Sequence, residues 1–151
     1  MSAVRLKAAA LLLDMDGARR RLAQLPPTRW ALVTSASRRV AEHRLLHAGL
    51  PLPRLLVCAG DVVRGKPDPE PYLLAASRLG LAPADCLVFE DAPAGIASAL
   101  QAGCQVVQMG GTRRYDDRLK GWLRDWRGIE IEVAPDGLHL HLPAPLPAEA
   151  G

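Results

Sequence analysis

The stretch AAALLLDMDG, residues Ala8–Gly17, decides the fold of this chain, because an apolar run leads directly into two acids and a glycine. Such a run is typical of a buried strand that ends at the polar edge of a sheet. Side chains alternate along a strand, so Asp14 and Asp16 are expected on one side, with Met15 facing away. Two carboxylates at this spacing repel each other unless they share a cation, and Mg²⁺ is a hard divalent ion that suits them. Taken alone, the stretch favours an ordinary strand end with solvated acids, so the functional interpretation depends on the rest of the chain.

Further apolar runs alternate with helix-like segments along the chain. The helix-like segments end at a glycine or at a pair of prolines, which are residues that stop helices. Strands that alternate with helices form a parallel sheet covered on both faces, so we expect an α/β fold with a Rossmann-like parallel sheet of about five strands flanked by helices. The expected strands are residues 8–13, 30–33, 55–58, 86–89 and 104–108, and the expected helices are residues 18–25, 38–48, 72–79 and 93–101.

The C-terminal part is patterned differently. Residues 129–133 and 138–142 alternate between apolar and polar side chains and flank Pro135-Asp136-Gly137, which predicts a β-hairpin. Before them, the segment Asp116–Trp126 carries apolar residues at helical spacing, so we expect a polar helix with one apolar face. The tail, residues 143–151, is rich in proline and is expected to be disordered. The chain is then expected to form a single domain over residues 1–142.

The composition argues against several classes of protein. No apolar stretch reaches the roughly 18 residues that cross a bilayer, so we expect no membrane partner. The net charge is +3, but the arginine clusters are scattered and lack neighbouring aromatic residues, so we expect an anionic small molecule rather than a nucleic acid as the partner. The three cysteines lie in or beside apolar runs without metal-type spacing, so we expect reduced core residues and a cytoplasmic protein.

Chemically versatile side chains follow each of the first four expected strands. The carboxyl ends of parallel strands meet at one edge of a sheet, where open α/β sheets build their sites. Phosphoryl transfer needs acids for a cation and for attack, hydroxyl donors and a fixed positive charge, because its transition state spreads negative charge over oxygens. The sequence provides this set in chain order: Asp14 and Asp16, then Thr34 and Ser35, then Lys66, and finally Glu90 and Asp91.

Four motifs in this order resemble those of the haloacid dehalogenase (HAD) superfamily of phosphohydrolases. Asp14–Gly17 is similar to the first motif, and Thr34–Ser35 is similar to the second. Gly65–Pro69 resembles the third motif in the form found in sugar phosphatases and β-phosphoglucomutases, and Glu90–Ile96 resembles the fourth. The resemblance implies an HAD-type core and a Mg²⁺-dependent phosphatase. Its substrates would be small phosphorylated metabolites, sugar phosphates above all, hydrolysed through an aspartyl-phosphate intermediate.

The resemblance also implies which residues are catalytic and which bind the metal. Asp14 would attack the phosphorus and become the aspartyl-phosphate, while Asp16 would protonate the leaving alkoxide and then activate water. Mg²⁺ would bind the carboxylate of Asp14, the backbone carbonyl of Asp16 and Asp91. Glu90 would be either a further ligand or a residue behind the ligands.

Phosphate binding follows from the second and third motifs. The hydroxyl of Thr34 or of Ser35 would bind the phosphoryl oxygens together with nearby N–H groups, and both positions stay open because family sequences use either one. Lys66 would neutralise the nucleophile and the phosphate. Plain structural roles remain open as well, because Thr34, Ser35, Glu90 and Asp91 could simply cap the helices that follow them.

Two departures from the family pattern concern the segment after Gly17. Ala18 stands where the family has threonine, and only residues 18–29 join the first two strands, where this branch inserts a helical cap domain. A parallel crossover needs about a dozen residues, so the core can close but no cap fits. A cap excludes water and supplies remote binding energy. The alternatives are a weak and unselective phosphatase with an open site, a site covered by a homo-oligomer or another protein, an inactive remnant that binds Mg²⁺ and phosphate, and a phosphomutase-like phosphotransferase.

Overall fold

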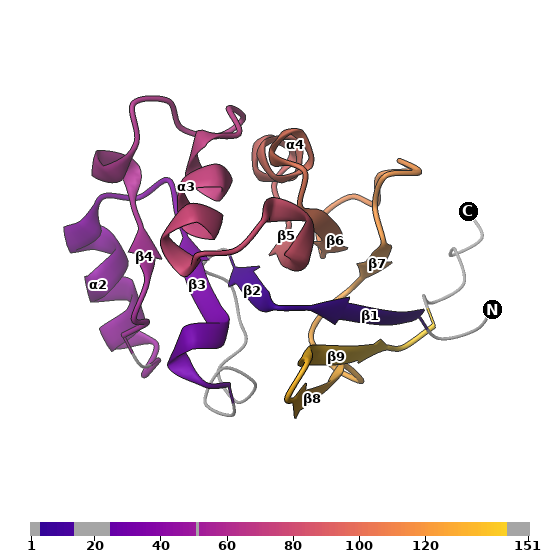
Figure 1. The fold of residues 1–151 in the computed structure, drawn as a ribbon. Helices are drawn as coiled ribbons and strands as arrows, with labels where there is room; N and C mark the ends of the chain where they lie inside the picture. Colours follow the sequence, from indigo (N-terminus) through magenta and orange to yellow (C-terminus); the bar gives the residue numbers. More distant parts are fainter. Residues whose placement is uncertain (1–3, 14–24, 51, 145–151) are drawn as a thin grey trace.

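Two β-sheets make up the framework of the molecule, one parallel and one antiparallel (Figure 1). The computed structural model describes residues 4–13, 25–50 and 52–144. In this part of the chain the larger sheet has six strands in the order β4-β3-β2-β5-β6-β7, and the smaller has three in the order β1-β9-β8. The strands are β1 (Val4–Ala8), β2 (Ala10–Leu13), β3 (Trp30–Val33), β4 (Leu56–Val57), β5 (Cys86–Glu90), β6 (Gln105–Met109), β7 (Gly121–Leu123), β8 (Glu130–Ala134) and β9 (Gly137–Leu142). The α-helices are α2 (Arg38–His47), α3 (Glu70–Leu79) and α4 (Pro93–Ala102).

The predicted α/β architecture is confirmed. Strands β2 to β6 occupy the five segments expected to be strands, and all their pairings in the larger sheet are parallel. Helices α2, α3 and α4 begin and end within two residues of the segments expected at 38–48, 72–79 and 93–101. Residues 18–24 of the expected first helix and residues 145–151 of the expected disordered tail lie outside the described residues.

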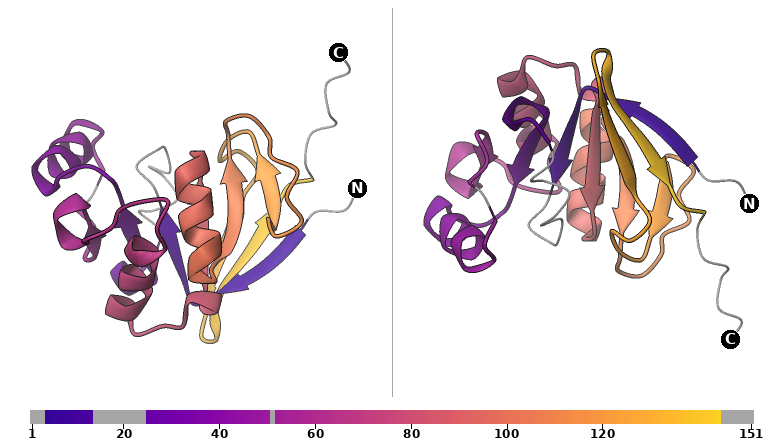
Figure 2. Two further views of the ribbon diagram at one scale, coloured as in Figure 1. Left: turned by 90° about the horizontal axis from the view of Figure 1, so that it is seen from above. Right: turned by 90° about the horizontal axis from the view of Figure 1, so that it is seen from below.

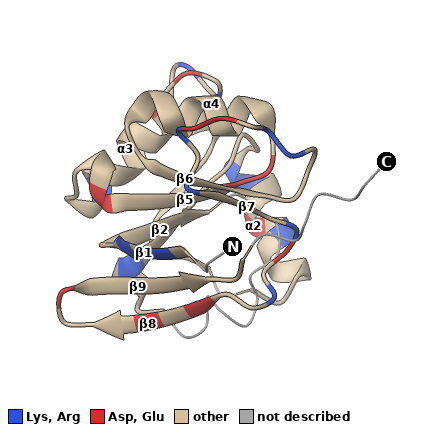
Figure 3. Cartoon of the chain, turned by 90° about the vertical axis from the view of Figure 1, so that its right-hand side faces the viewer, with Lys and Arg blue, Asp and Glu red and all other residues tan. Residues whose placement is uncertain are grey.

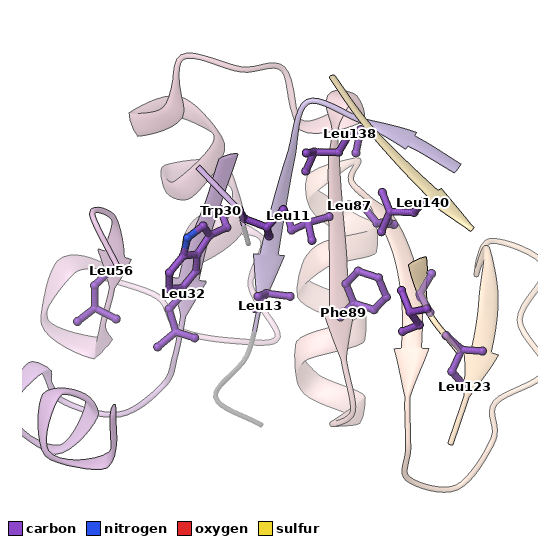
Figure 4. Packing of buried hydrophobic residues seen from close by; sticks show 14 of the residues in the cluster. Leu11, Leu13, Trp30, Leu32, Leu56, Leu87, Phe89, Leu123, Leu138 and Leu140 are labelled. Carbon is purple, nitrogen blue, oxygen red and sulfur yellow. The ribbon is translucent and has the colours of Figure 1, made fainter. Parts of the chain in front are cut away.

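The two faces of the parallel sheet are covered by different layers (Figure 2). On one face, α3 and α4 pack over alternate strand residues, which include Leu12 and Val88. On the other face, Leu11 and Leu87 belong to a cluster shared with α2 and with the small antiparallel sheet. Figure 4 shows the leucines of β9 beside Leu87. The sequence predicted helices on both faces, and β9 takes part of the second face because its apolar residues alternate, which gives it one apolar side.

The N-terminal segment contributes one strand to each sheet. The residues expected as one strand, 8–13, are divided at Ala9, whose N–H donates to the carbonyl of Asp85 (2.7 Å). Before the break, β1 pairs antiparallel with β9; after it, β2 runs parallel between β3 and β5. The predicted hairpin of β8 and β9 is confirmed and closes where Ala134 pairs with Gly137. Gly137 is required there, because its φ is 136° and a Cβ would lie 2.9 Å from the carbonyl oxygen of Ala8.

The helix predicted for Asp116–Trp126 is wrong. That segment contains β7, which adds to the parallel sheet by pairing with β6, and Trp122 lies opposite Gln108. The apolar residues of the segment do occur at helical spacing, but Leu119 packs with the α3–α4 cluster and Leu123 with the opposite cluster. The apolar residues of this segment are thus divided between opposite sides of the sheet, which one apolar face of a helix does not allow, so tertiary pairing outweighs the local pattern.

The prediction of reduced core cysteines is confirmed. Cys58, Cys86 and Cys104 are free and buried. Burial raises the pKa of the Cys86 thiol to about 11 and that of the Cys104 thiol to about 12, so both are neutral near pH 7. Within the described residues, no helix is long and apolar enough to cross a membrane.

Candidate active site

The carboxyl ends of β3, β2 and β5 lie side by side and define the candidate site. Leu13, the last residue of β2, pairs with Leu32 of β3 on one side and with Phe89 of β5 on the other. Val33 and Glu90, the last residues of those two strands, therefore flank the point at which the chain leaves β2 towards Asp14. Asp14 and Asp16 themselves lie outside the described residues.

Lys66 reaches this point from the loop after β4. Its side chain is 7% exposed, and its ammonium donates to the carbonyl of Val33 (3.0 Å) and to Oε2 of Glu90 (2.9 Å). Because Val33 ends β3 and Glu90 ends β5, the ammonium spans the end of the strand between them, which is β2. A positive charge is thus fixed beside the position from which the sequence continues to Asp14 and Asp16.

Glu90 is a buried carboxylate that accepts hydrogen bonds at both of its oxygens. It is 1% exposed, and Oε2 accepts from Lys66 and from the hydroxyl of Tyr72. Its Oε1 accepts from the N–H of Ala92 (3.3 Å). A Cβ at Gly95 would lie 2.0 Å from Cδ of Glu90, so any side chain at that position of α4 would have to displace the carboxylate. A buried carboxylate is tolerated only when it is paired and hydrogen-bonded. These contacts therefore indicate that Glu90 serves as the ion-pair partner of Lys66.

The second motif places one hydroxyl inside the fold and one outside. Thr34 is 6% exposed; its N–H donates to the carbonyl of Val57 (2.9 Å), and its Oγ1 accepts from the N–H of Ala36 (3.1 Å). Ser35 is exposed. Neither residue caps α2, because Ser37 is the N-cap and its Oγ accepts from the N–H of Val40 (3.3 Å). The plain capping role considered for Thr34 and Ser35 is therefore wrong.

Asp91 lies at the same edge, next to Glu90, and is partly exposed. It is not the cap of α4, whose N-cap is Ala92 and has no side-chain capping bond. A carboxylate that lies at the edge of the sheet and outside the core can reach a cation there, and oxygen ligands are those that Mg²⁺ prefers. Among the described residues, no group of three His, Cys, Asp or Glu is placed to hold a metal ion.

The loop that carries Lys66 is fixed by Asp68 of the loop itself, by Glu70 at the start of α3 and by Ser98 of α4. The carboxylate of Glu70 accepts from the N–H groups of Val63 (2.9 Å) and Arg64 (2.8 Å). Asp68 accepts from the N–H of Glu70 (3.0 Å), and the buried hydroxyl of Ser98 donates to the carbonyl of Asp68 (2.6 Å). The peptide bond between Lys66 and Pro67 is cis. Sequence analysis did not identify Glu70 or Ser98, because their roles are contacts with the loop and not chemistry.

Asp61 stabilises the turn that follows β4. The carboxylate of Asp61 accepts from the N–H of Cys58 (2.8 Å) and from the guanidinium of Arg38 (3.1 Å). The hydrogen bond from Cys58 is the main cause that holds the pKa of Asp61 below its usual value, with further help from Arg38. Asp61 thus closes a turn and joins the start of α2 to the loop after β4.

The connection between β6 and β7 borders the site on the side of β5 that faces away from β2. A Cβ at Gly111 would lie 3.1 Å from the carbonyl oxygen of Asp91, so the two segments are in close contact. The buried amide of Gln108 donates to the carbonyls of Gly110 (3.1 Å) and Thr112 (2.7 Å) and accepts from the N–H of Arg114 (2.9 Å). Basic and acidic residues both lie along this connection (Figure 3). Sequence analysis missed Gln108, whose polar side chain inside a strand was the available signal.

Comparison with protein families identifies the group to which this arrangement corresponds. The family model described as "haloacid dehalogenase-like hydrolase" matches residues 3–103. Hexitol phosphatase A of Escherichia coli is 58% identical over 78 residues, which cover 52% of this chain and 36% of that protein. Glycerol-1-phosphate phosphohydrolase 2 of Saccharomyces cerevisiae is 40% identical over 99 residues, covering 61% of this chain and 40% of that protein. The chain thus spans well under half the length of these relatives.

Solved structures agree with the observed fold. The crystal structure of a putative β-phosphoglucomutase from Thermotoga maritima has a TM-score of 0.52 and 30% identity, covering 62% of this chain and 47% of that one. CbbY from Rhodobacter sphaeroides, crystallised in complex with phosphate, has a TM-score of 0.58 and covers 64% of this chain and 46% of that one. Its identity of 21% means that this second likeness concerns the fold alone.

Proposed function

The chain belongs to the haloacid dehalogenase-like hydrolase family, and on this premise we propose that it is a Mg²⁺-dependent phosphatase of small phosphorylated metabolites, with sugar phosphates as the preferred class. One observation carries the proposal: the Lys66 ammonium is fixed between the ends of β3 and β5, across the end of β2. A phosphate monoester is doubly charged, and a preorganised cation in a poorly hydrated site stabilises the charge that spreads over its oxygens during transfer.

The proposed reaction has two steps at one phosphorus atom. A carboxylate oxygen of Asp14 forms a bond to phosphorus while the bond from phosphorus to the leaving oxygen breaks, and Asp16 gives its proton to that oxygen. Water then attacks the aspartyl-phosphate, Asp16 takes a proton from the water, and the bond between Asp14 and phosphorus breaks to release inorganic phosphate. Lys66 neutralises the phosphoryl oxygens in both steps, and Thr34 or Ser35 donates a hydrogen bond to them.

Mg²⁺ is proposed to bind Asp14, the backbone carbonyl of Asp16 and Asp91. When bound, the ion supplies positive charge that offsets the repulsion between the nucleophile and the phosphate. Glu90 is proposed to act behind these ligands, because both of its oxygens accept hydrogen bonds from Lys66, Tyr72 and the backbone of Ala92.

The substrate class is proposed from chemistry and from the names of the relatives. Hexitol phosphatase A and glycerol-1-phosphate phosphohydrolase 2 are named for small phosphorylated polyols, and the proposed site needs no more than a phosphate monoester.

The likeness to a putative β-phosphoglucomutase favours a phosphotransferase as the second candidate. Transfer to a sugar and not to water requires that water be kept out, which a cap does in this family, and only residues 14–29 join β2 to β3. We therefore place hydrolysis first. We also propose that residues 1–142 form a single domain, whose site is either open to solvent or covered by a second copy of the chain.

The test of this function is hydrolysis of a generic aryl phosphate with and without Mg²⁺, beside the variant Asp14→Asn. We expect turnover that needs Mg²⁺ and that falls by at least about a thousandfold in the variant, because the nucleophile is lost. Turnover that persists in Asp14→Asn, or its absence in both proteins, contradicts the phosphatase function. Addition of a sugar acceptor during the assay reveals a phosphotransferase as a phosphorylated sugar product.

A further inference from the structure

Tyr72 connects α3 to the candidate active site. The residue is fully buried, and its hydroxyl donates to Oε2 of Glu90, the same oxygen that accepts from the Lys66 ammonium. The ammonium also lies 5.2 Å from the centre of the Tyr72 ring. Tyr72 therefore contacts Lys66 directly through its ring and indirectly through the carboxylate of Glu90.

We propose that Tyr72 is a positioning residue for phosphate binding, and that its hydroxyl and ring hold the Lys66 ammonium, by way of Glu90, at the end of β2. The inference rests on the proposed function, because it assumes that Lys66 neutralises a bound phosphate. Tyr72 is not a catalytic residue, since its side chain has no exposed surface with which to contact substrate. We propose that it acts on the substrate through Lys66.

Packing explains the ring of Tyr72 but not its hydroxyl. The ring belongs to the core between the sheet and the α3–α4 layer, where phenylalanine would bury a similar apolar area. A buried hydroxyl is costly unless it is hydrogen-bonded, and here its acceptor is a buried carboxylate that is already paired with an ammonium. The hydroxyl therefore has a defined partner, and that partner is part of the charged site.

The hydroxyl affects how strongly Glu90 attracts Lys66. Each donor to a carboxylate offsets part of its negative charge, and Glu90 accepts from Tyr72 and from the N–H of Ala92 as well as from Lys66. Without the Tyr72 hydroxyl, more of that charge is directed at the ammonium, which is then drawn towards Glu90 and away from a phosphate. Removal of the hydroxyl also frees Glu90 to reorient. Both effects weaken phosphate binding.

The variant Tyr72→Phe tests the proposal, with inorganic phosphate as the probe and calorimetric titration in the presence of Mg²⁺ as the measurement. We expect phosphate affinity to fall by about threefold to tenfold, a fraction of the value of one hydrogen bond to a charged group. The matched control is Val106→Ala, which truncates a buried residue of the same core cluster that pairs with Val88, two residues before Glu90 in β5. The control is expected to lower the midpoint of urea unfolding without a change in phosphate affinity.

A double-mutant cycle with Lys66→Gln distinguishes positioning from a general structural effect. If Tyr72 acts through Lys66, then Tyr72→Phe causes no further loss of phosphate affinity in the Lys66→Gln background, so the two changes are strongly non-additive. Equal losses in the two backgrounds overturn the inference, and so does a Tyr72→Phe protein that binds phosphate like the wild type. Wild-type protein that binds no phosphate with Mg²⁺ overturns the inference and the proposed function together.

Discussion

At the scale of single residues, Gly95 shows how little room surrounds the charged pair of the site. Lys66 and Glu90 form an ion pair whose side chains are 7% and 0% exposed. The absence of a side chain at Gly95 lets the first turn of α4 approach the Glu90 carboxylate. Loss of one partner from a buried ion pair leaves an uncompensated charge, and displacement of a partner has the same consequence to a lesser degree.

The variant Gly95→Ala is therefore expected to lower the free energy of unfolding by about 1–3 kcal/mol, because the new methyl group displaces Glu90. Urea unfolding measures the change. Gly60→Ala is the control, since a Cβ there meets nothing within 4 Å, and its effect is expected to stay within about 0.5 kcal/mol. Equal stabilities for the two variants would show that the carboxylate moves aside without cost.

At the scale of elements, an ion pair adds to the backbone hydrogen bonds that hold the strands of the small antiparallel sheet together. Asp136, at the turn of the β8–β9 hairpin, forms a hydrogen bond with His139 (2.9 Å) and an ion pair with Lys7 of β1 (3.0 Å). The hydrogen bond with His139 is the first cause, and that with Lys7 the second, that lower the pKa of Asp136 to about 2. The turn is thus tied to β1, although the groups are exposed and the contribution is modest.

This lowered pKa gives a pH prediction for the sheet. The carboxyl is more acidic in the folded chain than in the unfolded chain, so its stabilising effect is complete above the unfolded value of 3.8 and is lost as pH falls towards about 2. We expect Asp136→Asn to be less stable than the wild type near neutral pH and to lose less stability over that acidic range. Urea unfolding at several pH values measures both slopes. Glu132→Gln, on the neighbouring strand β8, serves as the control, and the same slope in the Asp136→Asn protein as in the wild type would contradict the assignment.

At the scale of the whole molecule, the parallel sheet was predictable because each central strand is a short apolar run followed by polar residues. That pattern also predicted which residues meet at the carboxyl edge, and the structure places Thr34, Lys66 and Glu90 there. Two fold elements were not predictable from local pattern. Pairing with β6 makes a strand of Gly121–Leu123, and pairing with β9 separates β1 from β2.

The partners within the site also depended on tertiary structure. Tyr72 reads in the sequence as an apolar residue at the start of a helix, and nothing local indicates that its hydroxyl meets Glu90. The packing of α3 against β3, β4 and α4 sets that contact, and Glu90 also pairs with Lys66 from the loop before α3. The predicted roles of Asp14 and Asp16 remain proposals, because both residues lie outside the described part of the chain.

The most direct test of the central claim is the detection of a phosphoryl group on Asp14. A rapidly quenched reaction with a phosphate monoester and Mg²⁺, followed by proteolysis and mass spectrometry, locates the labelled peptide. The account predicts a peptide heavier by one phosphoryl group, with the modification on Asp14, and its loss in the Asp14→Asn protein. A wild-type protein that turns over substrate while its phosphoryl group is found on another residue, or on none, would contradict the account.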